Sequence, residues 1–178
     1  MTQKAKRNGC QLAIGYSDGP ARCFGKVLYK DKVSSRLTLK NDVIKALLDI
    51  ASRDGLIAER EKGRWRLCLD EALVNAIVHG NNGDPRRFVK VTLMAGNSRW
   101  AVLIEDEGEG FDPEDIPETG SLRSLYAESG RGILLMKEFT DELRYYRRGA
   151  SVMLVKSMTG ATGKRKPVKG KPDGPKGS

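Results

Sequence analysis

The chain has 178 residues, of which 39% are hydrophobic and 31% charged, and its formal net charge is +9. This length suits one domain with a substantial core, and the absence of any run of about 18 apolar residues argues against a membrane-spanning helix. No sustained apolar stretch follows the first charged residues, so we expect no secretory signal. Three cysteines without a CxxC spacing indicate reduced thiols in a cytoplasmic protein.

The positive charge lies mostly at the two ends of the chain. Six basic residues and one acid follow residue 157, and three basic residues with no acid precede residue 18. The body between them is almost neutral, which disfavours a nucleic-acid-binding domain. Residues 158–178 are rich in glycine, proline and lysine, so we expect a disordered tail whose contact with nucleic acid would be non-specific. We expect the folded domain to span residues 35–157, after an N-terminal extension, 1–34, with no assigned structure.

The first part of the domain is predicted to hold a short strand and two helices. Arg36–Leu39 has the pattern of a strand, and Asn41 has the residue type of a helix N-cap. Apolar residues then recur at helical spacing up to the break at Asp54–Gly55. A second helix is predicted from about Lys62 to Gly80, because it carries an apolar stripe that would face a core. That stripe consists of Trp65, Leu69, Ala72, Leu73 and Ala76.

The second part is predicted to consist mainly of strands. Apolar and polar residues alternate over 89–93, and large apolar residues recur at every second position over 100–104, after the turn at Gly96–Ser98. This pattern indicates an antiparallel hairpin. The segment Glu107–Ser129 is rich in acids, glycine and proline, and an aperiodic loop of this length is usually functional, often a lid. The last elements are a helix over Gly132–Phe139 and two strands, Leu143–Tyr146 and Ser151–Val155. Together these elements predict an α+β fold, a two-layer sandwich whose mostly antiparallel sheet carries helices on one face.

An acid, an amide and an imidazole share one line of the second predicted helix. Glu71, Asn75 and His79 follow one another at intervals of four residues, which places them along one slowly drifting line of an α-helix. A solvated polar face is the alternative interpretation, but such a face usually carries Lys, Glu and Arg, whereas alanines and valines surround these three residues. Asn is also a poor helix former. We therefore favour a functional site.

A second candidate site begins where a predicted strand ends. Asp106 is in register with Val102 and Ile104 and is expected on their face of the sheet. Gly108 and Gly110 then allow the backbone to approach a ligand closely or to adopt a positive φ. A single D-x-G-x-G string also occurs in ordinary turns, so this motif does not establish a site by itself.

A third candidate site precedes the helix over Gly132–Phe139. Gly130, Arg131 and Gly132 would present free backbone N–H groups at the start of that helix, where unpaired donors and the helix dipole favour an anion. Glycines are common before helices, so this motif is also weak when taken alone. The order of the three motifs along the chain is more specific than any one of them.

In this order, the three motifs resemble the N, G1 and G2 boxes of the GHKL ATPases. The resemblance covers about residues 36–156, and the strings EALVNAIVHGN, DEGEGFDP and SGRGILLMKEFTDEL are most similar to the bacterial serine/threonine-kinase anti-sigma factors. It implies the histidine-kinase-like ATPase fold and a cytoplasmic protein, often a homodimer, that binds ATP and Mg²⁺. It also implies two protein partners: a sigma factor that is sequestered, and an anti-anti-sigma factor that is phosphorylated on Ser or Thr.

The resemblance also assigns roles to individual residues. Glu71 matches the general base, Asn75 the amide that holds Mg²⁺ against the phosphates, and Asp106 the carboxylate that accepts a hydrogen bond from the adenine amino group. One departure is Glu128, at a position where many members carry Arg. The other matches are nucleotide-binding positions: His79, Gly108, Gly110, Phe111, Gly130, Arg131 and Gly132.

Three functions stay open on the sequence. The first is the kinase described above, the second is an ATP-loaded regulatory binding module without catalysis, and the third is a nucleic-acid-associated protein that uses its basic ends. Self-phosphorylation on histidine is disfavoured, because the chain has a single histidine. That residue, His79, lies inside the predicted nucleotide helix, so no second histidine is left to receive phosphate.

Overall fold

The structure is a computed structural model, and it describes residues 13–110 and 128–158. The strands in this part are β1 (Ala13–Ser17), β2 (Lys26–Ser34), β3 (Phe88–Ala95), β4 (Arg99–Glu105), β5 (Glu142–Tyr146) and β6 (Ser151–Ser157). They form one sheet in the order β1-β5-β6-β4-β3-β2. β1 runs parallel to β5, and every other neighbouring pair is antiparallel. The prediction of a mostly antiparallel sheet is therefore confirmed.

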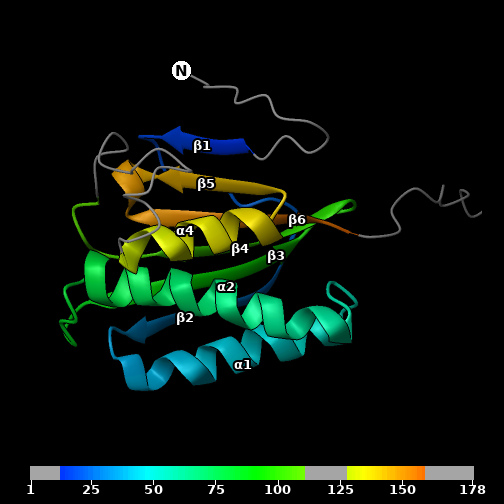
Figure 1. Cartoon of the computed structure of the whole chain (residues 1–178), viewed down its shortest axis with the longest axis horizontal. Helices are drawn as coiled ribbons and strands as arrows, with labels where there is room; N and C mark the ends of the chain where they lie inside the picture. Colours follow the sequence, from blue (N-terminus) through cyan, green and yellow to red (C-terminus); the bar gives the residue numbers. More distant parts are fainter. Residues whose placement is uncertain (1–12, 111–127, 159–178) are drawn as a thin grey trace, which may run out of the picture.

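The helices α1 (Leu37–Arg53), α2 (Lys62–Val74) and α4 (Glu128–Phe139) cover one face of this sheet (Figure 1). α2 lies between α1 and α4 and continues into a π-helical segment, η2 (Asn75–Gly80). Two short 3₁₀ turns complete this part of the chain, η1 (Glu59–Glu61) and η4 (Arg147–Gly149). The predicted two-layer α+β architecture is confirmed. No helix within the described ranges has the length and apolar character needed to cross a membrane.

The main core lies between the helices and the sheet. Ile44 and Leu47 of α1 and Leu69 of α2 are at most 2% exposed. Trp65 of α2 packs on Trp100 of β4 with the ring centroids 4.3 Å apart. Burying an apolar side chain of this size stabilises the fold by about 1.5–3 kcal/mol. This packing holds α1 in place, although its N-cap makes no side-chain hydrogen bond, because helices in proteins depend more on a buried face than on local preference.

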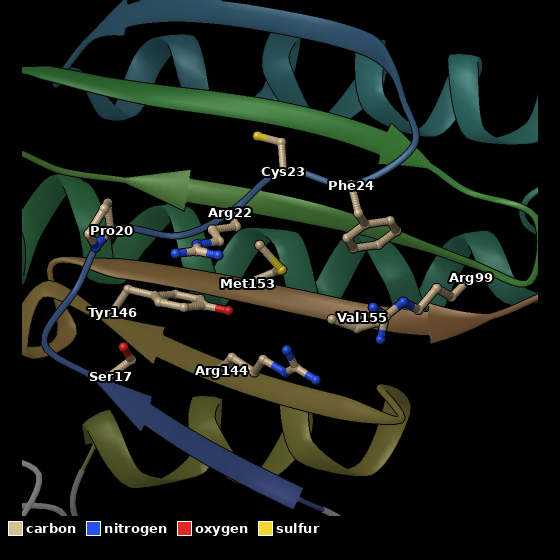
Figure 2. A pocket seen from close by; sticks show the side chains of 10 residues that line it. All are labelled: Ser17, Pro20, Arg22, Cys23, Phe24, Arg99, Arg144, Tyr146, Met153 and Val155. Carbon is tan, nitrogen blue, oxygen red and sulfur yellow. The ribbon is translucent and has the colours of Figure 1, made fainter.

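A second, smaller apolar cluster lies on the opposite face of the sheet. Residues 18–25, which we call the crossing segment, connect β1 at one edge of the sheet to β2 at the other and pass over this face (Figure 2). Ala21 and Phe24 of the crossing segment pack against the cluster. The chain therefore supplies its own cover on the side that carries no helices. The buried members of the cluster are Met94, Ala101, Leu103, Met153 and Val155.

The prediction for residues 36–41 was wrong. Arg36 is extended, but α1 begins at Leu37, so Asn41 is an interior residue of the helix and does not cap it. The strand that precedes α1 is β2, which ends at Ser34. The helix starts early because the chain turns at Ser35, which is buried and donates its N–H to the Arg87 carbonyl at 3.0 Å. A long-range contact, not a local capping residue, sets this boundary.

The other predicted elements differ mainly at their ends. The hairpin of β3 and β4, the strands β5 and β6, and the break after α1 are confirmed. The last helix begins at Glu128, four residues earlier than the predicted Gly132. β1 and β2 were not predicted at all, although both lie within residues 1–34. β2 was not predicted because lysines interrupt its apolar–polar alternation, at Lys26, Lys30 and Lys32. Exposed edge strands often carry such lysines.

Candidate functional site

The structure brings the three sequence motifs together at one end of the helical layer. The first motif occupies α2 and η2, the second follows β4, and the third lies in the first turns of α4. Gly132 of α4 lies against the side chain of Glu71, and Gly80 at the end of η2 lies against the carboxylate of Asp106. Motifs that are separated by up to 60 residues in the chain are thus in direct contact.

Glu71 is positioned by the packing of α2 against α4. Its side chain is partly buried, and a Cβ atom at Gly132 would overlap its Oε2 oxygen. Only glycine at position 132 lets α4 approach the carboxylate this closely. Cys68, one turn earlier on α2, is fully buried between the same helices. Burial, followed by the negative charge of Glu71, raises the pKa of the Cys68 thiol to about 12.

The helix changes its winding at Asn75, where α2 ends and η2 begins. The Asn81 N–H donates to the Ala76 carbonyl, five residues back, at 2.9 Å, as expected for a π-helical turn, and such turns occur often at functional sites. Asn75 is partly buried, whereas His79 is exposed. The line that the sequence predicted through Glu71, Asn75 and His79 assumed an unbroken α-helix, which ends before it reaches His79.

Asp106 is a buried carboxylate at the end of β4. It is 7% exposed, its N–H donates to the Ala150 carbonyl at 3.0 Å, and its Oδ1 accepts the N–H of Gly108 at 2.8 Å. Burial raises the pKa of Asp106 to about 6, although the Gly108 hydrogen bond and the charge of Arg147 oppose this rise. One hydrogen bond leaves the carboxylate further capacity to accept, so it is suited to a ligand N–H group.

Glycines permit the close contacts around this carboxylate. A Cβ atom at Gly80 would lie 2.6 Å from either oxygen of Asp106, and one at Gly108 would overlap the Gly80 carbonyl. Gly110 has a φ of +82°, and a Cβ atom there would collide with the carbonyl of Arg148. Gly108 and Gly110, which the sequence linked to ligand approach, are therefore also required by contacts within the chain itself.

Asn81, which the sequence motifs did not single out, has a structural role beside the site. This residue is completely buried, and its Nδ2 donates to Ser35 Oγ at 2.5 Å and to the Phe88 carbonyl at 2.9 Å. Its Oδ1 accepts the N–H of Glu107, the residue after Asp106, at 2.8 Å. Asn81 lies in the same string as Glu71 and Asn75, but no local pattern separates a buried amide from the exposed Asn82 beside it.

Some predicted positions lie outside the described residues. Phe111 is one of them, as is most of the proposed lid Glu107–Ser129, and the side chain of Arg131 is not described. The predicted donors at the start of the last helix shift in position. Because α4 begins at Glu128, the N–H groups of residues 128–130 have no acceptor within the helix, whereas the N–H groups of residues 131 and 132 are used within it.

The site combines groups that can donate and accept hydrogen bonds. Its three motifs contribute a buried carboxylate, a partly buried amide and the first turns of α4. Within the described ranges, no group of three or more His, Cys, Asp or Glu side chains is placed to hold a metal ion.

Comparison with known proteins agrees with this geometry. The family model of the histidine kinase-like ATPase domain matches residues 33–156. An anti-sigma F factor of Anoxybacillus flavithermus is 30% identical over 98 residues, which cover 51% of this chain and 66% of that protein. The serine/threonine-protein kinase BtrW of Bordetella bronchiseptica is 31% identical over 119 residues, covering 66% of this chain and 83% of BtrW. The serine-protein kinase RsbW of Bacillus subtilis is 30% identical over 121 residues, covering 64% and 75% of the two chains.

The chain belongs to the histidine kinase-like ATPase family, and its fold and matched region define an ATP-binding domain. Within that family, its similarity to the anti-sigma F factor and to the kinases BtrW and RsbW places it with the GHKL anti-sigma kinase type. The chain spans only between about half and two thirds of the length of the anti-sigma F factors that it matches.

Proposed function

We propose that this protein is an ATP-dependent serine/threonine protein kinase that acts as an anti-sigma factor. In this proposal it phosphorylates a Ser or Thr of an anti-anti-sigma protein and sequesters a sigma factor. The observation that supports it most is the contact of Glu71 with Gly132, because it joins a carboxylate to the first turns of α4. Catalysis of phosphoryl transfer requires that kind of juxtaposition, with an acid or base beside a phosphate-binding element.

Asp106 is proposed to select the base of the nucleotide. Its ionised carboxylate accepts a hydrogen bond from the amino group of adenine, and a hydrogen bond to a charged group is worth about 1.5–3 kcal/mol. Guanine presents an oxygen at the equivalent position, which a carboxylate repels. The buried position of Asp106 supports this role, since water competes less for a buried acceptor.

Asn75 and the start of α4 are proposed to hold the phosphate end. The Asn75 side-chain oxygen is a hard ligand of the kind that Mg²⁺ prefers, and one protein oxygen suffices when phosphates and water supply the rest. The free N–H groups of residues 128–130 bind phosphate oxygens. Bound ATP supplies the phosphoryl group, and Glu71 removes the proton from the hydroxyl of the partner protein that receives it.

Phosphate transfer from labelled ATP to a cognate anti-anti-sigma protein tests the role of Glu71. We expect Glu71→Gln to lower the rate by about 10²–10⁴-fold, the usual contribution of a general base, with little change in ATP affinity. Glu138→Gln is the matched control, because Glu138 is exposed on α4 and should behave as wild type. Equal labelling by wild type and Glu71→Gln would remove Glu71 from catalysis. Tight ATP binding with no transfer by the wild-type protein would instead favour the ATP-loaded binding module.

Calorimetric titration of ATP with and without Mg²⁺ tests the role of Asn75. We expect the wild-type protein to bind ATP more tightly when Mg²⁺ is present, and Asn75→Ala to lose most of that difference. Ligation through an oxygen would be retained in Asn75→Asp, so this variant should keep the dependence on Mg²⁺. If Asn75→Ala responds to Mg²⁺ as the wild type does, the metal is held elsewhere.

A further inference from the structure

A pocket of about 470 Å³ lies on the face of the sheet opposite the helices. Its walls are the crossing segment and the strands β4, β5 and β6 (Figure 2). Its volume falls within the range of small-molecule sites, roughly 300–1,000 Å³. The crossing segment precedes residue 33, where the match to the ATPase family begins. This pocket is therefore separate from the nucleotide site and depends on a part of the chain that the family model does not cover.

The pocket carries an excess of positive charge. Arg22, Arg99 and Arg144 all line it. Glu142 is the acid beside them: it forms an ion pair with Arg144, and its Oε1 lies 3.6 Å from Nη1 of Arg99. Arg22 forms no ion pair or hydrogen bond with any residue in the described ranges, and it is exposed. Glu142 thus pairs with two of the three guanidinium groups, and the third, that of Arg22, is available to a ligand.

The floor of the pocket is apolar. Met153 and Val155 are each 2% exposed and belong to the second apolar cluster. The ring of Phe24 forms one side and is held by Arg99, whose guanidinium carbon lies 4.7 Å from the ring centroid. Tyr146 and Arg22 border the same space (Figure 2). A ligand that fits this lining has one charged end and an apolar body.

We propose that this pocket binds a small organic anion, with its oxyanion on the unpaired Arg22 and its apolar body over Met153 and Phe24. Planar guanidinium groups bind carboxylate and phosphate oxygens with directed, charge-assisted hydrogen bonds. The ligand is a small molecule, because a hollow under a crossing segment encloses a compact body better than it accommodates a protein surface. This assignment does not rest on the proposed kinase activity.

Titration of the ¹⁵N-labelled full chain with two probes, phenyl phosphate and 3-phenylpropionate, tests the pocket. We expect saturable changes in the amide signals of Arg22, Tyr146 and Met153, and little change at Asp106. The two probes distinguish a phosphate head group from a carboxylate. Arg22→Gln should weaken binding roughly tenfold or more, the effect of losing a charge-assisted hydrogen bond, and Arg22→Lys should retain part of it. Lys26→Gln is the control, since Lys26 is exposed but does not line the pocket.

Three results would overturn the assignment. One is the absence of saturable changes at the pocket with both anions. Another is binding to Arg22→Gln with the affinity of the wild type. The last is equal affinity for the neutral 3-phenylpropanamide, which would mean that charge has no part in recognition.

Discussion

At the scale of single residues, the buried carboxylate of Asp106 lowers the stability of the ligand-free protein at neutral pH, at a position proposed to bind the nucleotide. The protein buries a carboxylate that water would otherwise solvate, and its pKa rises from 3.8 to about 6 as a result. Because the pKa of Asp106 is higher in the folded state, the folded protein binds this proton more tightly than the unfolded protein does. The stabilising contribution of protonated Asp106 is therefore present at low pH and is lost as the pH rises from about 4 through 6. At neutral pH, the buried charge is a cost that the ligand-free protein carries.

Replacing Asp106 with Asn should remove that cost. We expect Asp106→Asn to raise the free energy of unfolding of the ligand-free protein at pH 7 by up to about 3 kcal/mol, from about 1.4 kcal/mol for each unit of pKa shift. The gain should shrink as the pH falls below 6. Urea denaturation at several pH values measures it, with the exposed Glu109→Gln as control. A variant that is less stable than the wild type at pH 7 would contradict the physical account.

The same substitution should weaken ATP binding, because an amide oxygen is a poorer acceptor than a carboxylate. In the wild type, the affinity for ATP should decline as Asp106 takes up its proton below a pH of about 6. In Asp106→Asn this decline should disappear. If both proteins show the same pH profile, another group controls the recognition of the base.

At the scale of elements, glycine determines how closely α4 and η2 approach their neighbours. The contact of Gly132 with Glu71 joins α4 to α2, and that of Gly80 with Asp106 joins η2 to the end of β4. The sequence indicated the glycines of the second and third motifs, and it indicated Glu71 and Asp106. It did not indicate which glycine contacts which acid, because the helices pack through residues that are far apart in the chain.

A methyl group at position 132 should separate α4 from Glu71. We expect Gly132→Ala to reduce phosphate transfer at least tenfold, because the Cβ atom would overlap the Glu71 carboxylate and misplacement of about 1 Å near a reacting group is costly. Gly63→Ala on α2 is the matched control, since a Cβ atom there meets nothing within 4 Å. This control should gain about 0.5–1 kcal/mol of stability from helix propensity. Unchanged transfer in Gly132→Ala would show that the contact is not needed.

At the scale of the whole molecule, one buried amide joins segments that are distant in the sequence. Asn81 links the turn before α1, the start of β3 and the loop after β4 through Ser35, Phe88 and Glu107. Each bond is made inside the protein, where an unpaired polar group is costly. The position of Asp106 therefore depends on contacts that extend across the sheet.

Removal of the Asn81 side chain should loosen this arrangement. We expect Asn81→Ala to lower the free energy of unfolding by about 1–3 kcal/mol, because the N–H of Glu107 and the carbonyl of Phe88 lose their part-buried hydrogen bonds to the Asn81 side chain. ATP affinity should fall as well, since Glu107 adjoins Asp106. Thermal and chemical denaturation measure the first effect, and calorimetry the second. Asn82→Gly is the control: Asn82 is exposed and has a φ of +54° that glycine adopts easily, so its stability should match that of the wild type.

The packing on the helical face of the sheet could be predicted from the sequence, whereas the packing on the opposite face could not. The helical face follows from periodicity, because α1 and α2 carry apolar stripes and apolar and polar residues alternate over 89–93 in β3. The other face depends on β1 and the crossing segment, whose residues have no periodic pattern. Phe24 is an isolated aromatic residue in the sequence, and only the sheet shows that it covers Met94 and Met153.

The sequence by itself determined the order of the three motifs, the class of fold and the candidates Glu71, Asn75 and Asp106, because these are local patterns of residue type and spacing. Tertiary structure alone decided the contact between Gly132 and Glu71, the burial of Asn81, the π-helical turn at Asn75 and the pocket below the crossing segment. Each of these depends on residues that the chain brings together from a distance. The contacts between these residues stabilise the fold only after the sheet, the helical layer and the crossing segment have come together.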